Sequence, residues 1–224
     1  MRRLKVWDLP TRLFHGSLAL AVLGLIVSGN IGGPWMAWHL RLGYLVLALL
    51  LFRLGWGVVG GHWARFRQFV YSPAATWAYL KGQRQPADDI GHNPLGALSV
   101  FAMLAVLGLQ VGSGLFSDDE IAFFGPLSHL VSSETASLAT QYHTTIGKLL
   151  LIALLALHLG AVLYHQLLKG EALVNAMWHG HKPMNDPSGL LPASLDGWPQ
   201  RLLALVVATG SGVASWWIVS LGPA

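Results

Sequence analysis

The chain has 224 residues, of which 54% are hydrophobic and only 11% are charged, and its formal net charge is +4. Soluble domains carry about 25% charged residues, so this chain has too few charges to cover a water-facing surface, and lipid is the expected solvent for much of it. It has no soluble basic domain that would bind nucleic acid. Cysteine is absent, which excludes disulfides, cysteine-ligated iron–sulfur clusters and covalent attachment of c-type haem.

Five apolar runs are long enough to cross a bilayer, which takes about 20 residues. In chain order they are 13–31, 39–59, 95–116, 143–168 and 202–221. Each is expected to be a helix, because open strands cannot satisfy their backbone hydrogen bonds in lipid. A short helix is expected over 74–81, within a connector between the second and third runs. The fold class predicted from this pattern is all-α and integral to a membrane.

Positive charge alternates along the loops. Lys and Arg occur before the first run, between the second and third, and between the fourth and fifth: Arg2, Arg3, Lys5 and Arg12; Arg65, Arg67, Lys81 and Arg84; Lys169, Lys182 and Arg201. Residues 117–142 have neither and carry Asp118, Asp119, Glu120 and Glu134. Because positive charge favours the cytoplasmic side, the N-terminus is predicted to be cytoplasmic and the C-terminus extracytoplasmic.

Four histidines in these runs have depths that pair. His39 and His143 share the outer half of the membrane, and His15 and His158 share the inner half. His143 and His158 are 15 residues apart, which on one continuous helix is a rise of about 22 Å and a net rotation of about 60°. Two cofactors at separate depths fit this spacing. One shared metal ion does not, because its bonds of about 2 Å require clustered ligands.

Haem fits paired intramembrane histidines, because helix bundles build cofactor sites from side chains on facing helices. A bis-histidine haem also needs small residues nearby. The runs contain Gly24, Ser28, Gly29, Gly43, Gly108, Gly112, Gly147 and Gly160. The alternative role for these residues is close helix–helix packing.

Several cationic groups are further candidates for cofactor binding. Arg12 and Arg41 can pair with haem propionates or simply anchor the chain at the interface. Arg53 and Lys148 lie inside apolar runs, where a charge is costly and usually faces a partner. That partner can be a propionate, a lipid headgroup or a quinone. His165, two turns after His158, can contact a propionate or a quinone, or lie at the interface.

Four sequence motifs add to the histidine pattern. They are VWDLPTRLFH at 6–15, HLRLG at 39–43, FRLGWG at 52–57 and GHNPLG at 91–96. Together with His143 and His158 they resemble the bacterial cytochrome b561 and nickel-hydrogenase b-type cytochrome family over about residues 5–182. The resemblance implies a four-helix transmembrane core that binds two b haems by bis-histidine ligation, to which this chain adds a fifth C-terminal transmembrane helix.

The resemblance also assigns the ligands. His15 and His158 would hold the cytoplasmic-side haem, and His39 and His143 the outer one. The family spacing between the two fourth-helix histidines is about 14 residues, one fewer than here. A local bulge in the helix would absorb the extra residue.

The function implied by the resemblance is a respiratory-chain cytochrome in the bacterial inner membrane. It would carry electrons between the quinone pool and a periplasmic partner, either a c-type cytochrome or a hydrogenase-like enzyme. Alternatives are a membrane-anchor subunit with structural haem and a haem-free transporter or scaffold. Catalysis by the chain itself as a quinone-linked oxidoreductase, and a homodimer, both stay open. The predicted domains are 1–182, the haem-binding part, and 183–224, a linker with the added helix.

Overall fold

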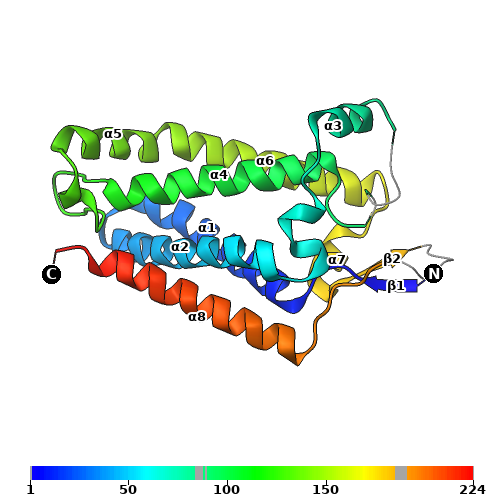
Figure 1. Ribbon diagram of the computed structural model, residues 1–224. Coiled ribbons are helices and arrows are strands. Elements are labelled where there is room, and N and C mark those ends of the chain that lie inside the picture. The colour runs from blue at the N-terminus through cyan, green and yellow to red at the C-terminus, as the bar shows by residue number, and fades with distance from the viewer. Residues whose placement is uncertain (1, 84–87, 89, 185–190, 224) are drawn as a thin grey trace. The chain divides into compact units, whose positions relative to one another are not determined.

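Helices dominate the computed structural model, which describes residues 2–83, 88, 90–184 and 191–223. Five helical spans in these residues are long and apolar enough to cross a membrane. They are α1 (Leu9–Ile31), α2 (Met36–Val59), α4 (Pro94–Phe116), the consecutive helices α5 (Ser133–Thr144) and α6 (Ile146–Leu167), and α8 (Trp198–Ser220) (Figure 1). The predicted helical membrane class with five spans is confirmed.

Helix α1 begins at Leu9, earlier than the predicted start at residue 13. The reason is Asp8, whose Oδ1 accepts a hydrogen bond of 2.8 Å from the backbone N–H of Thr11. A carboxylate in this position caps a helix N-terminus, and Pro10 in the first turn suits a position that needs no N–H donor. The polar start of the helix therefore lies outside the apolar run that predicted it.

The fourth span is broken, contrary to the prediction of one continuous helix from His143. Helix α5 ends at Thr144 and α6 begins at Ile146, and Thr145 between them has φ −117° and ψ −87°, outside the helical range. His143 lies in the last turn of α5. The rotation of about 60° calculated between His143 and His158 is therefore wrong, because it assumed an unbroken helix. The resemblance predicted a bulge within one helix between these two histidines, and the structure instead has a break between two helices at Thr145.

The chain forms two compact units, and every long helical span contributes to both. Unit 1 contains residues 1–13, 53–102 and 155–205, and unit 2 contains residues 14–52, 103–154 and 206–224. Each unit has its own set of contacts and is described separately below. The predicted domain boundary after residue 182 falls inside strand β2 (His181–Met184) of unit 1, and the two-domain division stays a prediction.

Unit 1 contains a small antiparallel sheet that the sequence analysis did not predict. Strand β1 (Arg2–Lys5) pairs with β2, with Leu4 opposite Lys182 (Figure 1). Helix α7 (Leu173–His179) precedes β2, and its terminal Gly180 accepts hydrogen bonds from the backbone N–H groups of Val6 and Trp7. Apolar side chains fill the centre of this unit: Leu4, Val6, Trp7, Trp63, Ile90 and Ala176.

The described part of the connector between α2 and α4 in unit 1 contains two short turns and one short helix. They are η2 (His62–Ala64), η3 (Phe66–Gln68) and α3 (Pro73–Leu80). Helix α3 matches the predicted short helix at 74–81, and the hydroxyl of Ser72 caps it by accepting the N–H of Ala75 at 3.2 Å.

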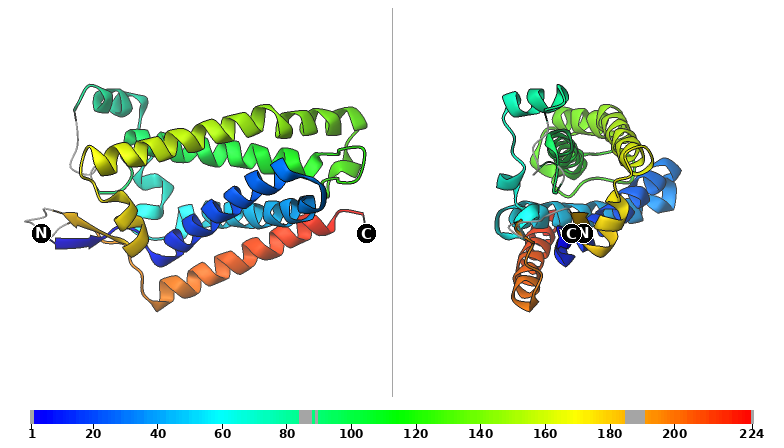
Figure 2. Two further views of the ribbon diagram at one scale, coloured as in Figure 1. Left: turned by 180° about the vertical axis from the view of Figure 1, so that it is seen from behind. Right: turned by 90° about the vertical axis from the view of Figure 1, so that its right-hand side faces the viewer.

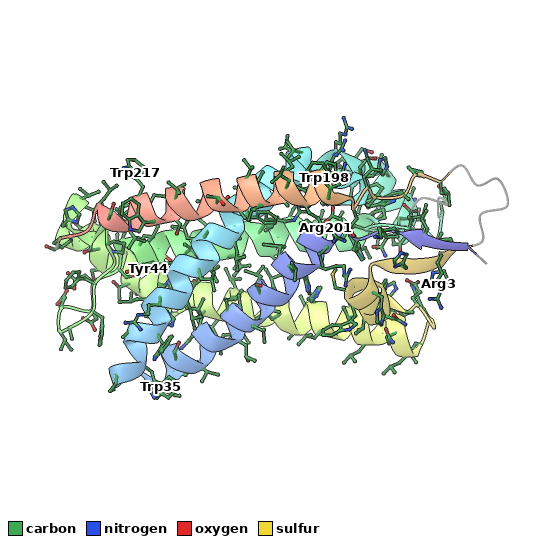
Figure 3. All side chains as sticks on the ribbon, turned by 90° about the horizontal axis from the view of Figure 1, so that it is seen from below. Arg3, Trp35, Tyr44, Trp198, Arg201 and Trp217 are labelled. Carbon is green, nitrogen blue, oxygen red and sulfur yellow. The ribbon has the colours of Figure 1, made fainter. Side chains whose placement is uncertain are left out.

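Unit 2 brings the C-terminal part of α4 beside α5, as both views in Figure 2 show. Helix α8 meets α2 where the Ser215 hydroxyl donates to the Tyr44 carbonyl at 3.0 Å, and Figure 3 labels Tyr44 together with Trp217 on α8. Between α4 and α5 the chain forms an isolated bridge from Asp118 to Phe124 and the short turn η5 (Ser128–Leu130). A further turn, η1 (Gly33–Trp35), precedes α2.

Candidate functional site

His39 and His143 lie together in unit 2. His39 is in the first turn of α2 and His143 in the last turn of α5. Their ring centroids are 5.9 Å apart, and the ring planes are inclined at 86°. Both rings line a cavity of about 320 Å³, within the range of about 300–1,000 Å³ that is usual for small-molecule sites.

The His39 ring is held by helix α1. Its Nδ1 lies 3.1 Å from the Leu25 carbonyl oxygen and 3.4 Å from the Ser28 hydroxyl. Because a carbonyl oxygen can only accept, Nδ1 carries the proton and donates it to Leu25. The Nε2 atom of a neutral ring is then the free lone pair. Gly29 packs against the same ring, and a Cβ there would lie 2.9 Å from Cε1 of His39.

The His143 ring is held in the same way by helix α4. Its Nδ1 donates to the Gln110 carbonyl at 2.8 Å and lies 3.3 Å from the Ser113 hydroxyl. The Gln110 side chain adds a second tie, because its Nε2 donates to the backbone carbonyl of His143 at 2.8 Å. A Cβ at Gly114 would lie 2.9 Å from Cε1 of His143. The free lone pair of this neutral ring is again Nε2.

Two imidazoles with free Nε2 atoms fit a metal that brings its own equatorial ligands. Two rings bound on opposite sides of one metal atom, with bonds of about 2 Å, have centroids roughly 6 Å apart, and 5.9 Å is observed. Among the described residues, no group of three or more His, Asp or Glu gathers to hold a bare ion. The iron of a haem needs only two axial ligands from the protein, so this donor set matches haem.

The cavity walls are mainly aliphatic, which suits a flat apolar macrocycle. Leu25, Leu40, Val46, Leu107, Val111 and Leu151 contribute to them. The cationic Lys148, which the sequence analysis singled out as a charge inside a span, also lines this cavity. The cavity therefore combines apolar walls with one group able to pair with an acidic substituent.

The second predicted pair is divided between the units. His15 of α1 belongs to unit 2 and His158 of α6 to unit 1, and both rings are half-buried. Their pairing stays a prediction.

Two candidate propionate partners have protein contacts of their own. The Arg12 guanidinium donates from Nε to the Met177 carbonyl at 3.2 Å and from a terminal nitrogen to the Trp178 carbonyl. These carbonyls belong to the last turns of α7, where a cation is favourable. Arg41 is exposed, and its guanidinium lies 5.1 Å from the Trp38 ring centroid. Arg12 thus ties α1 to α7, and Arg41 is the more accessible of the two.

Among the lysines and arginines whose side chains the structure describes, Arg53 is the most buried, with 5% of its surface exposed. Its guanidinium carbon lies 4.6 Å from the Phe66 ring centroid and 6.0 Å from that of Phe69. The Nη1 atom has no hydrogen-bond partner among the described residues. A desolvated cation with a spare donor is what an acidic or carbonyl ligand would pair with.

His165 is near an acidic side chain. Its Nδ1 lies 3.2 Å from Oε1 of Glu171, whose other oxygen is 4.0 Å from Nζ of Lys182. The angles at His165 do not meet hydrogen-bond geometry, so the contact is an ion pair when the ring is protonated. Nδ1 of His165 therefore faces a carboxylate of the protein itself.

Three residues of the site were missed by the sequence analysis: Gln110, Ser113 and Gly114. Gln110 carried a signal, because a lone amide in an otherwise apolar span usually has an interhelical partner. Ser113 and Gly114 also had a signal in the sequence, because they repeat the Ser-Gly pair found at Ser28 and Gly29. The recurrence gains meaning only once each pair is seen against a histidine ring.

Comparison with known proteins confirms the family resemblance over most of the chain. A family model described as prokaryotic cytochrome b561 matches residues 6–180. The probable Ni/Fe-hydrogenase 1 B-type cytochrome subunit of Escherichia coli K12 is 24% identical over 210 residues, covering 79% of this chain and 89% of that protein. The probable Ni/Fe-hydrogenase B-type cytochrome subunit of Azotobacter vinelandii is 26% identical over 216 residues, covering 81% and 89%. No solved structure matches significantly.

Proposed function

Because this chain belongs to the prokaryotic cytochrome b561 family and is therefore a haem-binding membrane protein of electron transport, we propose that it is a dihaem cytochrome b. In this proposal it passes electrons between the quinone pool and an extracytoplasmic redox protein. The observation that carries the proposal is the His39–His143 pair, with ring centroids 5.9 Å apart in an apolar cavity.

His39 and His143 would hold the outer haem through their Nε2 atoms. The carbonyls of Leu25 and Gln110 support this assignment, because each accepts the Nδ1 proton and so selects the tautomer that can bind iron. A bound haem supplies the one-electron redox change. The chain's own residues orient the two rings and, through the aliphatic cavity walls, exclude water.

His15 and His158 are assigned to the second haem. This assignment rests on the VWDLPTRLFH motif that ends at His15 and on the family match, which includes both residues. Arg12 and Arg41 are proposed as propionate partners because each lies within three residues of an assigned ligand. Arg53 and His165 are proposed to border a quinone site, since Arg53 has an unused donor in an apolar setting.

The orientation proposed from the loop charges places the N-terminus in the cytoplasm of a bacterium and the C-terminus in the periplasm. The outer haem then lies toward the periplasm. The names of the curated relatives refer to Ni/Fe-hydrogenase, so a hydrogenase-like enzyme is the first partner we propose, with a c-type cytochrome as the other. A homodimer stays a proposal that nothing in the chain favours.

The proposal is tested by reducing the purified protein in liposomes with a quinol. We expect b-type absorption bands that appear on quinol addition and disappear when an external one-electron acceptor is supplied. Bands that respond to dithionite but not to quinol would leave only a structural role for the haem. Protein without such bands, purified from haem-sufficient cells, would instead support a haem-free transporter or scaffold.

A further inference from the structure

The two histidines of the outer pair rest against equivalent stretches of two different helices. On α1 the stretch is Leu25-Ile-Val-Ser-Gly29, and on α4 it is Gln110-Val-Gly-Ser-Gly114. We propose that these stretches form two copies of one histidine cradle, whose serine and glycine positions determine how strongly the ligands bind and how readily the site is reduced. The His39 cradle is Leu25, Ser28 and Gly29, and the His143 cradle is Gln110, Ser113 and Gly114. The inference rests on the proposed ligand roles of His39 and His143.

The equivalence holds position by position. The first residue of each stretch offers its carbonyl to the histidine Nδ1, at 3.1 Å for Leu25 and 2.8 Å for Gln110. The serine three residues later places its hydroxyl 3.4 Å and 3.3 Å from the same nitrogen. Residues at i, i+3 and i+4 share one helix face, so each ring meets all three groups. The first, second and fifth residues of both stretches line the cavity.

The glycines are required by space. A Cβ at Gly29 or Gly114 would lie 2.9 Å from Cε1 of its histidine, closer than packed carbon atoms approach. An added methyl group must therefore push the ring away from the helix. Gly112 provides a matched control on the same helix, because a Cβ there has no neighbour within 4 Å. The corresponding position of the other stretch is Val27, which already carries a side chain.

The serines act on the acceptor that each histidine uses. The Ser113 hydroxyl donates to the Gln110 carbonyl at 3.0 Å, the same oxygen that accepts from His143. Ser28 donates mainly to the Gly24 carbonyl at 2.7 Å and only distantly, at 3.4 Å, to that of Leu25. Ser113 therefore competes for the ligand's acceptor much more strongly than Ser28 does. Both are positioning residues, since they reach the metal only through a histidine.

The competition for the Gln110 carbonyl determines in which direction the redox equilibrium of the outer haem should shift. A histidine that donates its Nδ1 proton to a stronger acceptor becomes a more basic metal ligand. A more basic ligand stabilises oxidised iron over reduced iron. Removing the Ser113 hydroxyl takes away one donor that competes with His143 for the Gln110 carbonyl. We therefore expect the reduced form of the outer haem to become less favoured in Ser113→Ala, and less so in Ser28→Ala.

The test is a redox titration of the purified protein followed by absorbance, with haem content measured in parallel. Ser113→Ala should keep full haem content and shift the equilibrium between reduced and oxidised outer haem by roughly two- to tenfold toward oxidised, as expected for one neutral hydrogen bond. Ser28→Ala should shift it less, and Ser113→Thr, which keeps a hydroxyl, should restore it. Gly114→Ala should lose outer haem, and Gly112→Ala should retain it.

Two arms separate this inference from the ligand assignment. If His143→Ala leaves the haem content unchanged, the assignment itself fails. If His143→Ala removes one haem but Ser113→Ala titrates as wild type and Gly114→Ala behaves as Gly112→Ala, the ligands stand and the cradles are overturned. Retention of the other haem in Gly114→Ala shows that this variant is folded.

Discussion

Two buried polar sites, Asp8 in unit 1 and the histidine pair in unit 2, use their hydrogen-bonding groups in opposite ways. In unit 1 the Asp8 carboxylate is fully buried, and the N–H groups of Thr11, Gly61 and Trp56 donate to it at 2.8 to 3.3 Å. In unit 2, His39 and His143 use one ring nitrogen against a helix carbonyl, and no described residue occupies the other. A carboxylate whose hydrogen bonds are all made within the protein stabilises the fold. A ring that is held by one nitrogen, with a free lone pair on the other, is available to a ligand.

The largest effect is expected at Asp8, whose removal should lower the stability of the protein. Asp8→Ala leaves the buried N–H groups of Thr11 and Gly61 without this acceptor and removes the N-terminal cap of α1, while the Trp56 indole N–H keeps the Thr11 hydroxyl at 3.2 Å. We therefore expect the free energy of unfolding to fall by about 3–5 kcal/mol, from two unsatisfied buried donors and a lost cap. Thermal unfolding of the detergent-solubilised protein measures this. Asp119→Ala, an exposed acid in a loop, serves as the control. A wild-type unfolding temperature for Asp8→Ala would show that the network is not what holds unit 1.

A smaller effect is expected at Asp196, where unit 1 ties the start of α8 to β1. Its carboxylate accepts from Nζ of Lys5 at 2.9 Å and from Nε of Arg201 at 3.2 Å. Burial raises the pKa of Asp196, but the hydrogen bonds from Lys5 and Arg201 outweigh it and leave the pKa below its ordinary value. A depressed carboxyl pKa stabilises the fold above the unfolded pKa of about 4 and loses that contribution as the pH falls through the folded pKa.

The stability of Asp196→Asn relative to wild type should therefore depend on pH. We expect a deficit of roughly 1 kcal/mol at pH 7, in keeping with a partly exposed pair, and convergence of the two proteins in acid below the folded pKa. Unfolding curves at a series of pH values measure the difference. A deficit that stays constant down to strongly acidic pH would rule out the ion pairs as its source.

The smallest effect is expected at Asp119, an exposed carboxylate in the loop before α5 of unit 2. Oδ1 of Asp119 accepts from the backbone N–H groups of Phe123, Ala122 and Ile121 at 2.8 to 3.0 Å, and these bonds lower the pKa of Asp119. Asp119→Ala should speed hydrogen exchange at these three amides severalfold, and Asp119→Asn, which keeps an acceptor, should change exchange less. Unchanged exchange at the three amides in Asp119→Ala would contradict a role for this carboxylate in holding the loop.

The sequence predicted those features that depend on composition along one helix. The five spans follow from apolar runs, and α3 follows from Ser72 and Pro73 at its start. The helix break at Thr145 was not predicted, because the residues around it are ordinary within helices. Strand β1 was interpreted only as a basic flank, since its pairing with β2 depends on residues far away in the chain.

The candidate site was likewise predicted only in part. That histidines are the candidate ligands, and that His39 partners His143, were inferred from their depth in the membrane. The cradles were not, because a carbonyl, a hydroxyl and a glycine become recognisable only when a ring from another helix is placed against them. Gly29 and Ser28 were noted as small residues that could serve either a haem or helix packing, and the structure places both against His39.

The haem-to-protein ratio of the His39→Ala/His143→Ala double variant tests the central claim most directly. Wild-type protein from haem-sufficient cells should contain two haems per chain, and the double variant one, with His129→Ala, a loop histidine outside the cavity, unchanged from wild type. A double variant that still carries two haems would contradict the account, because the two rings that meet in unit 2 would then not be the ligands.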